Sequence, residues 1–161
     1  MGKLNPPRLL APADQLERFS SGSEPQDFWI REKARLASAA NTARVYVVSN
    51  ESEVVGYFAL AAASALREDL PRSLRGDMPR HRIPLVLLAR LAVAEKHQRQ
   101  GIGAGLISTA LAISMRVAGQ IGAMGLATNA IDAEAKSFCE AMGFRPSLID
   151  ESLLVFPLGR G

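Results

Sequence analysis

The first half of the chain carries two short apolar runs separated by a polar turn. Val45–Val48 and Val54–Ala61 are rich in β-branched and aromatic residues, and Asn50 lies in the polar stretch between them. Two such runs in succession predict an antiparallel hairpin. Gly56 interrupts the second run, and we expect a β-bulge there because a glycine inside a strand often marks one.

A short strand and a helix are predicted ahead of this hairpin. Ser23 and Gln26 stand three residues apart, which is the spacing of a capping box at a helix N-terminus. The predicted helix runs to about Ala40. Residues placed on it are Phe28, Trp29, Lys33 and Leu36.

From Pro84 onward, runs typical of strands and helices alternate. Pro84–Val93 is almost continuously apolar, which predicts a buried strand, and its one charged residue is Arg90. Apolar residues then recur three or four apart, which predicts a helix ending near Gly119. The buried stripe of this helix comprises Ile102, Leu106, Ala110, Ile113 and Val117. Three further elements are expected: a strand at Gly122–Thr128, a helix at Ala133–Met142 and a strand at Ser152–Pro157. This order indicates an α/β fold with a mixed sheet.

Length and composition favour one compact domain. The chain has 161 residues, 48% of them hydrophobic, which is enough for a single core over residues 1–161. We recognise no signal peptide and no apolar run near 18 residues, and therefore expect a soluble, cytoplasmic protein without membrane contact. The single cysteine excludes an internal disulfide. His81, His97 and Cys139 have no metal-ligand spacing, so no metal is expected.

Arginines gather in the connector between the hairpin and the long apolar strand. The net charge of +3 is too small to argue for nucleic acid by itself, but the distribution is uneven. The connector is either a solvated loop or a basic rim that contacts the phosphates of a large anionic substrate. Its charged residues are Arg67, Arg72, Arg75, Arg80 and Arg82, against Glu68, Asp69 and Asp77.

A glycine turn follows the apolar strand and opens the long helix. Gly101 and Gly103 allow close approach of an anion, and the first turn of the helix offers backbone N–H groups. A nucleotide-triphosphate loop is excluded because Gly105 is followed by Leu106 instead of a lysine. A dinucleotide fingerprint is disfavoured because the position of its third glycine is also Leu106. The turn therefore predicts a phosphate-bearing cofactor.

Two motifs resemble the GNAT N-acetyltransferases. The first is Gln-x-x-Gly-x-Gly at 98–103 after Leu91-Ala92-Val93, and the second is Ala135–Phe144, similar to the closing helix of the family. The resemblance implies an acetyl-CoA cofactor and a mixed sheet in which two central parallel strands splay apart. The pantetheine arm is expected to lie between those strands and to pair with the backbone of Leu91, Ala92 and Val93. The pyrophosphate is expected on the amides of Gln98, Arg99, Gln100, Gly101, Ile102, Gly103 and Ala104.

The same resemblance suggests further cofactor contacts at Asn129 and Lys136, near the pantetheine or ribose-phosphate end. Asn129 is equally interpretable as the start of the next helix, and Lys136 as part of a solvated helix face.

One branch of the family is more similar than the rest, namely the toxins that acetylate the amino acid on charged tRNA. The resemblance rests on Ser73–Pro79, on Pro84–Val93, and on Arg116-Val117-Ala118 followed by Ile121-Gly122. It implies an aminoacyl-tRNA substrate, a ribbon-helix-helix antitoxin and a homodimer. An acetyltransferase acting on a small-molecule or protein amine stays an alternative.

Amine chemistry independently favours an α-amino substrate. A lysine amine with pKa about 10.4 is neutral about once in 2,500 molecules at pH 7, whereas an α-amine near 8 is about one-tenth neutral, a difference of about 3 kcal/mol. Glu95 precedes the glycine turn and is interpreted as a surface residue instead of a base. Arg90 is expected either to hold the 3′ end of tRNA or to be a paired structural arginine. Arg72 and Arg75 are the other candidate substrate contacts.

Cys139 departs from the toxin pattern. Toxins of this branch carry a tyrosine directly after the phenylalanine of the closing helix, and that tyrosine is taken to protonate the departing thiolate. A cysteine sulfur ends about 3 to 4 Å short of a tyrosine oxygen, so Cys139 is expected to act through a bridging water or a shifted cofactor and to give slowed turnover. The alternatives are Ser137 as the proton donor, or a degenerate module that binds acetyl-CoA without catalysis.

Overall fold

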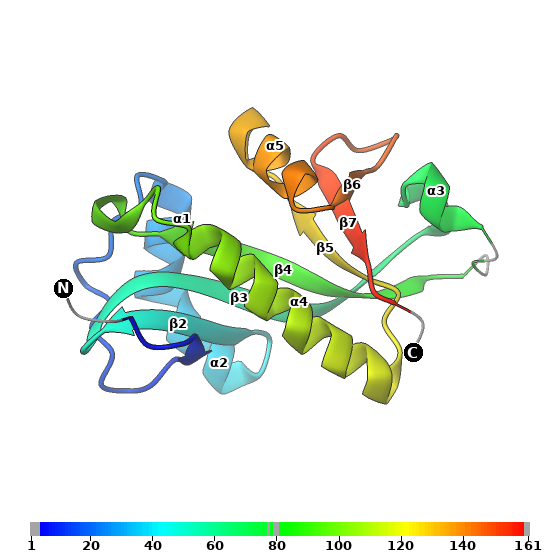
Figure 1. Cartoon of the computed structure of the whole chain (residues 1–161). Helices are drawn as coiled ribbons and strands as arrows, with labels where there is room; N and C mark the ends of the chain where they lie inside the picture. The colour runs from blue at the N-terminus through cyan, green and yellow to red at the C-terminus, as the bar shows by residue number, and fades with distance from the viewer. Residues whose placement is uncertain (1–3, 77, 79–80, 160–161) are drawn as a thin grey trace. The chain divides into compact units, whose positions relative to one another are not determined.

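The computed structural model describes residues 4–76, 78 and 81–159. Asp77, Pro79 and Arg80 of the arginine-rich connector lie outside the described residues. Figure 1 labels the elements along the chain. In order they are β1 (Arg8–Leu9), α1 (Glu24–Phe28), the π-helical η1 (Trp29–Lys33), α2 (Ala34–Ala40), β2 (Arg44–Asn50), β3 (Glu53–Ala65), the 3₁₀ turn η2 (Arg67–Asp69), α3 (Arg72–Arg75), β4 (Ile83–Val93), the 3₁₀ turn η3 (Glu95–His97), α4 (Ile102–Ile121), β5 (Gly125–Asn129), α5 (Ala133–Ala141), β6 (Arg145–Pro146) and β7 (Leu153–Pro157).

The strands form one mixed sheet, as the sequence predicts. Their order is β1-β2-β3-β4-β5-β7-β6. β1 pairs antiparallel with β2, and β2 with β3, while β4 is parallel to β5. The predicted bulge is present one residue from Gly56: Val48 pairs with Gly56 but Ser49 pairs with Val54, so Val55 is skipped.

The contacts divide the chain into two units, each made of two segments. Unit 1 comprises residues 1–61 and 89–110, and unit 2 comprises residues 62–88 and 111–161. In unit 1 the core is formed by the N-terminal helices, β2, β3 and the end of β4. Its buried members are Leu16, Phe19, Ile30, Ala34, Ala43, Val45, Val47, Val54, Tyr57, Ala59 and Ala92.

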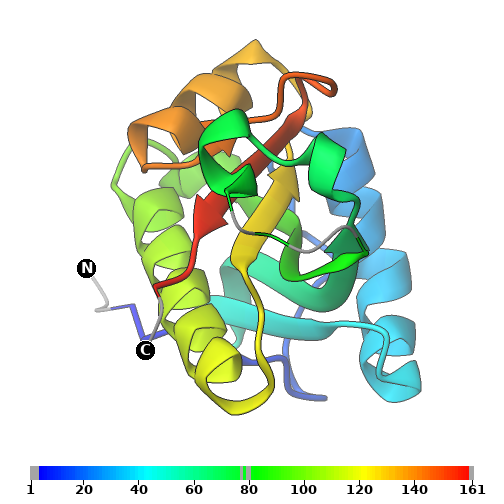
Figure 2. The same cartoon turned by 90° about the vertical axis from the view of Figure 1, so that its right-hand side faces the viewer.

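Unit 2 has a core of its own around β5 and β7, which run side by side in Figure 2 (yellow and red). Its buried members are Leu70, Ile83, Leu85, Ala127 and Val155. Gly125 is required at the start of β5, because a Cβ there would lie 2.7 Å from Val155 Cγ1 and 2.9 Å from the Phe156 carbonyl oxygen.

The start of the N-terminal helix differs from the prediction. Ser23 occupies the N-cap position but its side chain makes no capping hydrogen bond, so the predicted capping box is wrong. Gln26 is buried instead and points its amide oxygen at Tyr57 and Arg90. The helix also contains the π-helical segment η1, which the sequence pattern did not indicate. π-Helical turns are rare and occur often at functional sites.

The long helix α4 corrects a second expectation. It runs to Ile121, and an 18-residue window of this helix has a mean hydropathy of 1.5, so an apolar run long enough to cross a membrane is present among the described residues. This is weak evidence for a membrane span because core helices of water-soluble domains meet the same criterion. The helix carries Leu106, Ile107 and Ala110 as buried residues of unit 1.

Candidate functional site

The glycine turn (Gln98–Ala104) joins η3 to the first turn of α4. Arg99 and Gly101 both have left-handed backbone, with φ of 65° and 82°. Gly105 N donates to Gly101 O at 3.1 Å, which starts the hydrogen-bond ladder of α4. N–H groups of a helix's first turn have no carbonyl within the helix to donate to, and they lie at the positive end of its dipole. The turn therefore has the backbone of an anion site.

The two sides of this turn differ in packing. A Cβ built at Gly101 or at Gly105 would have no heavy atom within 4 Å, so these glycines face open space. On the opposite side, a Cβ at Gly56 would lie 3.3 Å from Leu106 Cδ1 and 3.4 Å from Ile102 Cγ2. Gly56 thus lets α4 lie close against β3 within unit 1, while the outer side of the turn has room for a ligand.

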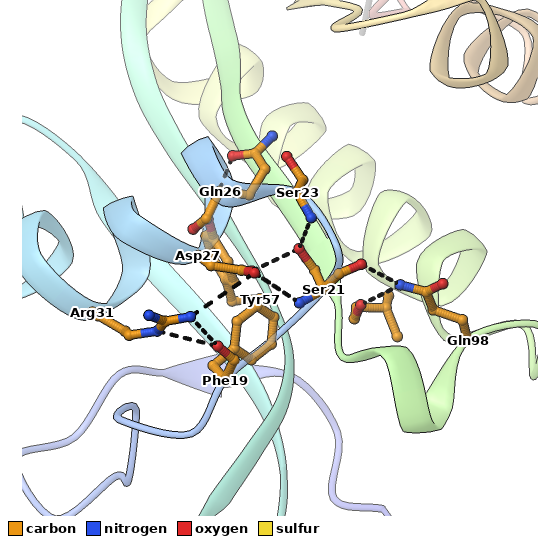
Figure 3. A network of polar contacts seen from close by, with 9 residues as sticks. Phe19, Ser21, Ser23, Gln26, Asp27, Arg31, Tyr57 and Gln98 are labelled. Atoms are coloured by element: carbon orange, nitrogen blue, oxygen red, sulfur yellow. Dashed lines mark hydrogen bonds and ion pairs between the residues drawn. The ribbon is translucent and has the colours of Figure 1, made fainter.

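Gln98 fixes the entry to the turn through its side chain. Its Nε2 donates to Val93 O and to Ser21 O, both at 2.8 Å (Figure 3). Because the side chain is engaged in this way, any contact of Gln98 with a phosphate has to come from its backbone. Among the predicted pantetheine-pairing residues, Ala92 is buried and Leu91 and Val93 are half-buried.

The pairing of β4 with β5 ends before these residues. The parallel register runs from Leu85 opposite Gly125 to Leu88 opposite Thr128, and Thr128 Oγ1 donates to Leu88 O at 3.0 Å. The following stretch of β4, Ala89–Val93, belongs to unit 1. The register thus ends before Leu91–Val93, the residues whose backbone the family resemblance implies for the pantetheine arm.

Arg90 is half-buried beside the N-terminal helix. Its Nη1 donates to Gln26 Oε1 at 3.4 Å, and its guanidinium carbon lies 5.8 Å from the centroid of the Trp29 ring. Trp29 in turn stacks on Tyr57, with centroids 6.0 Å apart. The partners of Arg90 are thus an amide and an indole ring in place of a carboxylate, and its contact with the 3′ end of tRNA stays a prediction.

Tyr57 is the most buried polar group in this cluster. Its hydroxyl donates to Gln26 O at 2.7 Å, and the side chain is 0% exposed. Burial raises the pKa of the Tyr57 phenol above its usual range, so it stays protonated throughout the neutral range.

Asn129 and Lys136 lie in unit 2. Asn129 is the exposed last residue of β5 and accepts from Ser152 Oγ at 3.4 Å. The N-cap of the next helix is Asp132, whose side chain accepts from Ala135 N, so the alternative of Asn129 as a helix start is wrong. Lys136 is half-buried in the first turns of α5. Their predicted contacts with the cofactor stay predictions.

Cys139 lies on α5 with 8% of its surface exposed. Burial raises the pKa of its thiol above the usual value, so the group is protonated at neutral pH. A protonated thiol is the form that a proton donor needs. Ser137, the alternative donor, is exposed on the same helix.

Some arginines of the connector are bonded to backbone carbonyls and are therefore not free to bind a substrate. Arg75 donates from Nε to Leu70 O at 3.1 Å and from Nη2 to Glu68 O at 2.6 Å, and Arg67 donates to Gly76 O at 3.1 Å. Arg75 therefore links the end of α3 to η2 and to Leu70, which does not support its prediction as a substrate contact. Arg72 is exposed one turn earlier.

Comparison with known proteins identifies the family. A model described as an acetyltransferase (GNAT) domain matches residues 41–146. The chain belongs to the GNAT acetyltransferases. This GNAT protein is 33% identical over 150 residues to a tRNA-acetylating toxin of Mycobacterium tuberculosis, with 93% of this chain and 90% of the relative covered.

Two solved structures extend the comparison. AtaT complexed with acetyl-methionyl-tRNAfMet is 28% identical, with a TM-score of 0.89 and coverage of 96% of this chain and 95% of that chain. AtaTR bound with AcCoA is 28% identical, with a TM-score of 0.84 and coverage of 96% and 94%. The expected GNAT fold, acetyltransferase activity and acetyl-CoA cofactor are thereby confirmed.

The structure of this GNAT protein suits a pyrophosphate at the glycine turn. The left-handed Gly101, the open side of the turn and the unpaired amides expected at the start of α4 together form a cradle that a Cβ would fill. Among the described residues, no group of three or more His, Cys, Asp or Glu side chains could hold a metal ion.

Sequence reasoning missed several polar residues of this site. Ser21, Asp27 and Tyr57 were not singled out, and Gln26 was assigned to a cap. Tyr57 donates to Gln26 across 31 positions, and Ser21 O accepts from Gln98 across 77 positions, contacts for which local periodicity carries no signal. Asp27 bonds to Ser21, only six positions away, and the hydrophobic pattern does not indicate that pair.

Proposed function

We propose that this protein acetylates the α-amino group of an aminoacyl-tRNA and thereby acts as the toxin of a toxin–antitoxin pair. The observation that carries the proposal is the similarity over nearly the whole length to a tRNA-acetylating toxin, at 33% identity over 93% of the chain. The similarity to AtaT in complex with acetyl-methionyl-tRNAfMet supports the same substrate class.

The cofactor site is assigned to unit 1. The backbone amides of the glycine turn would hold the pyrophosphate, and the backbone of Leu91–Val93 would hold the pantetheine arm. Bound acetyl-CoA supplies a thioester, whose acetyl group is transferred to an amine. The two left-handed residues of the turn, Arg99 and Gly101, support this assignment because they preset the backbone before any ligand binds.

The reaction needs little base catalysis for an α-amine. Such an amine with pKa near 8 is about one-tenth neutral at pH 7, so the enzyme mainly has to orient it. Arg90 is positioned by Gln26 and Trp29 and is our candidate for holding the 3′ end of the tRNA. The exposed Arg72 is the candidate phosphate contact of the connector.

Cys139 is our candidate for the group that protonates the leaving thiolate. Its burial keeps the Sγ proton in place at neutral pH, which supports a donor role. The short side chain requires a bridging water, and positioning would then supply most of the rate enhancement.

The partners are proposed from the relatives. A mutant of the toxin AtaT, with phenylalanine in place of a tyrosine, has been solved bound to the C-terminus of the antitoxin AtaR. We infer that this protein has an antitoxin of the ribbon-helix-helix type, forms a homodimer and works in the cytoplasm.

A direct assay tests the proposal. Labelled acetyl-CoA is offered with aminoacylated tRNA, and deacylated tRNA and free amino acids serve as controls. Label on charged tRNA alone is the expected result. Label on small-molecule or protein amines instead would favour the second candidate function, an acetyltransferase for such amines. This candidate is kept because the guanidinium of Arg75 is bonded to backbone carbonyls and is not free to bind tRNA phosphates. No transfer to any amine, with acetyl-CoA binding intact, would indicate a module that has lost its chemistry at Cys139.

A further inference from the structure

A short stretch before the first helix, the serine segment (Ser20–Ser23), lies between α1 and the turn η3. On the helix side, the carboxylate of Asp27 accepts from Ser21 N at 2.9 Å and from Ser21 Oγ at 2.6 Å (Figure 3). Asp27 is 3% exposed, so these bonds form away from bulk solvent. Such a carboxylate is held in place by its donors and fixes them in return.

Other bonds restrain the ends of this segment. Arg31 donates from Nη2 to Phe19 O at 2.8 Å and from Nε at 3.2 Å, which fixes the residue before the segment. Ser23 N donates to Ser21 Oγ at 3.1 Å, and Asp27 N donates to Ser23 O at 3.0 Å. The segment is therefore held rigidly on the N-terminal helix.

On its other side the serine segment holds the chain that leads into the glycine turn. Glu95 N donates to Ser20 O at 2.8 Å, and Gln98 Nε2 donates to Ser21 O at 2.8 Å. Gly22 has φ of 91°, and a Cβ there would lie 3.1 Å from Glu95 Oε1, so the two stretches are in close contact.

One peptide group connects the two sides directly. The carbonyl of Ser20 and the N–H of Ser21 belong to the same peptide unit. Its N–H donates to the Asp27 carboxylate while its C=O accepts from Glu95 N. A charged acceptor on the N–H polarises the amide and strengthens the bond that its carbonyl accepts. Removing the charge of Asp27 therefore weakens a bond at the start of η3, although Asp27 makes no contact with the turn.

We propose that Asp27 and Ser21 are positioning residues for acetyl-CoA, which preset the glycine turn through Glu95 N and the Gln98 side chain. The proposal rests on the pyrophosphate site assigned above. Every contact in this relay lies within unit 1. The energetic consequence is preorganisation: amides already held in the binding geometry lose less conformational freedom when the anion binds.

The test compares acetyl-CoA affinity in a set of full-length variants by titration calorimetry. Asp27→Asn keeps the shape and removes the charge, and it is expected to raise the Kd about fivefold, the equivalent of one neutral hydrogen bond. Gln98→Met removes both Nε2 donors and is expected to raise the Kd about fivefold to tenfold. The double variant should bind more weakly than Gln98→Met, but by less than the product of the two single effects, because Gln98→Met removes one of the two bonds through which Asp27 acts and leaves the bond of Glu95 N.

The free protein gives an independent readout. Amide hydrogen exchange in the glycine turn should be about fivefold faster in Asp27→Asn than in the wild type without any ligand. Ser21→Ala, at a half-buried position, removes one donor to Asp27 and should produce smaller changes of the same kind, which keeps the test open if Asp27→Asn does not fold.

Asp14→Asn is the matched control. Asp14 is also buried, at 5% exposed, and accepts from Arg8 and Ala11 N, but its bonds do not lead to the glycine turn. Asp14→Asn should lower the free energy of unfolding while the Kd for acetyl-CoA and the amide exchange rates of the glycine turn stay at their wild-type values. Unchanged Kd and exchange in Asp27→Asn, or multiplied effects in the double variant, would overturn the relay.

Gly101→Ala separates this proposal from the cofactor site itself. Alanine is strained at φ of 82°, so the Kd should rise about tenfold if the pyrophosphate binds at this turn. An unchanged Kd in Gly101→Ala would refute the assigned site. A raised Kd in Gly101→Ala with wild-type binding in Asp27→Asn and Ser21→Ala would refute the relay alone.

Discussion

The hydroxyl of Tyr57 offers a quantitative test of the core beneath Arg90. Tyr57→Phe removes one oxygen and keeps the ring, which stacks on Trp29 at 6.0 Å and meets the edge of Phe19 at 5.5 Å. The packing of the aromatic group is therefore unchanged. The lost interaction is the 2.7 Å hydrogen bond to Gln26 O.

The loss of stability in Tyr57→Phe depends on the donors that Gln26 O keeps. Trp29 N also donates to this carbonyl, so the oxygen is not left without a partner in the variant. The cost is accordingly the net value of one hydrogen bond, about 1 kcal/mol, and not the larger penalty of an orphaned buried group. For a chain of this length the shift in Tm is about 2 to 4 °C.

The pH dependence of the same variant provides a sharper test. Burial raises the pKa of Tyr57 in the folded protein, whereas the unfolded tyrosine titrates near its ordinary value of about 10. As pH rises past that value, the unfolded state releases its proton first, so the wild type loses stability that is fully present at neutral pH. At pH 11 the loss is about 1.4 kcal/mol, which cancels the advantage of the wild type over Tyr57→Phe.

Urea unfolding at pH 7 and at pH 11, followed by circular dichroism, measures both effects. Tyr46→Phe is the control, because Tyr46 is half-buried and stacks on Phe58 at 4.9 Å; its cost should stay below about 0.5 kcal/mol. The reasoning is refuted if Tyr57→Phe is as stable as the wild type at pH 7, or if the difference between them is the same at both pH values.

Three further predictions follow from unit 1 and unit 2. Cys139→Tyr should raise the kcat of acetyl transfer if a bridging water limits the wild type, and a steady-state assay that shows no gain would count against Cys139 as the donor. Gly125→Ala should lower the free energy of unfolding by about 2 kcal/mol or more in urea titrations, because its Cβ would meet Val155 Cγ1 at 2.7 Å; a neutral effect would mean that β5 and β7 can separate locally. The hydrogen bond from Arg8 lowers the pKa of Asp14, so this carboxylate contributes stability above about pH 4 that is lost as pH falls further. In Asp14→Asn the free energy of unfolding should therefore fall less steeply below about pH 4 than in the wild type. Equal slopes in the two proteins would contradict the pairing.

The order of strands and helices was predictable because, in most elements, the spacing of apolar residues follows the repeat of a strand or of a helix. β4 was expected at Pro84–Val93 and is found at Ile83–Val93, and α5 was expected at Ala133–Met142 and is found at Ala133–Ala141. The left-handed turn at Gly101 could also be anticipated, since glycine is the residue that adopts such a backbone without strain.

The polar contacts of the site could not be predicted in this way. Gln98 bonds to a residue 77 positions away, and Arg90 bonds to Gln26 across 64 positions. Hydrophobic periodicity describes which face of an element is buried, but it does not identify the element that covers that face. The same limit explains Arg75, whose charge suggested a substrate contact although nearby carbonyls engage its guanidinium.

The division of the chain into discontinuous units has a consequence for synthesis on the ribosome. Unit 1 needs residues 89–110 as well as its N-terminal segment, and unit 2 needs the chain to the end. A nascent chain that has emerged only to residue 88 thus lacks the glycine turn altogether, together with Ala92 of the unit 1 core and with Ala127 and Val155 of the unit 2 core. The glycine turn assigned to acetyl-CoA is therefore made only after more than half of the chain has been synthesised.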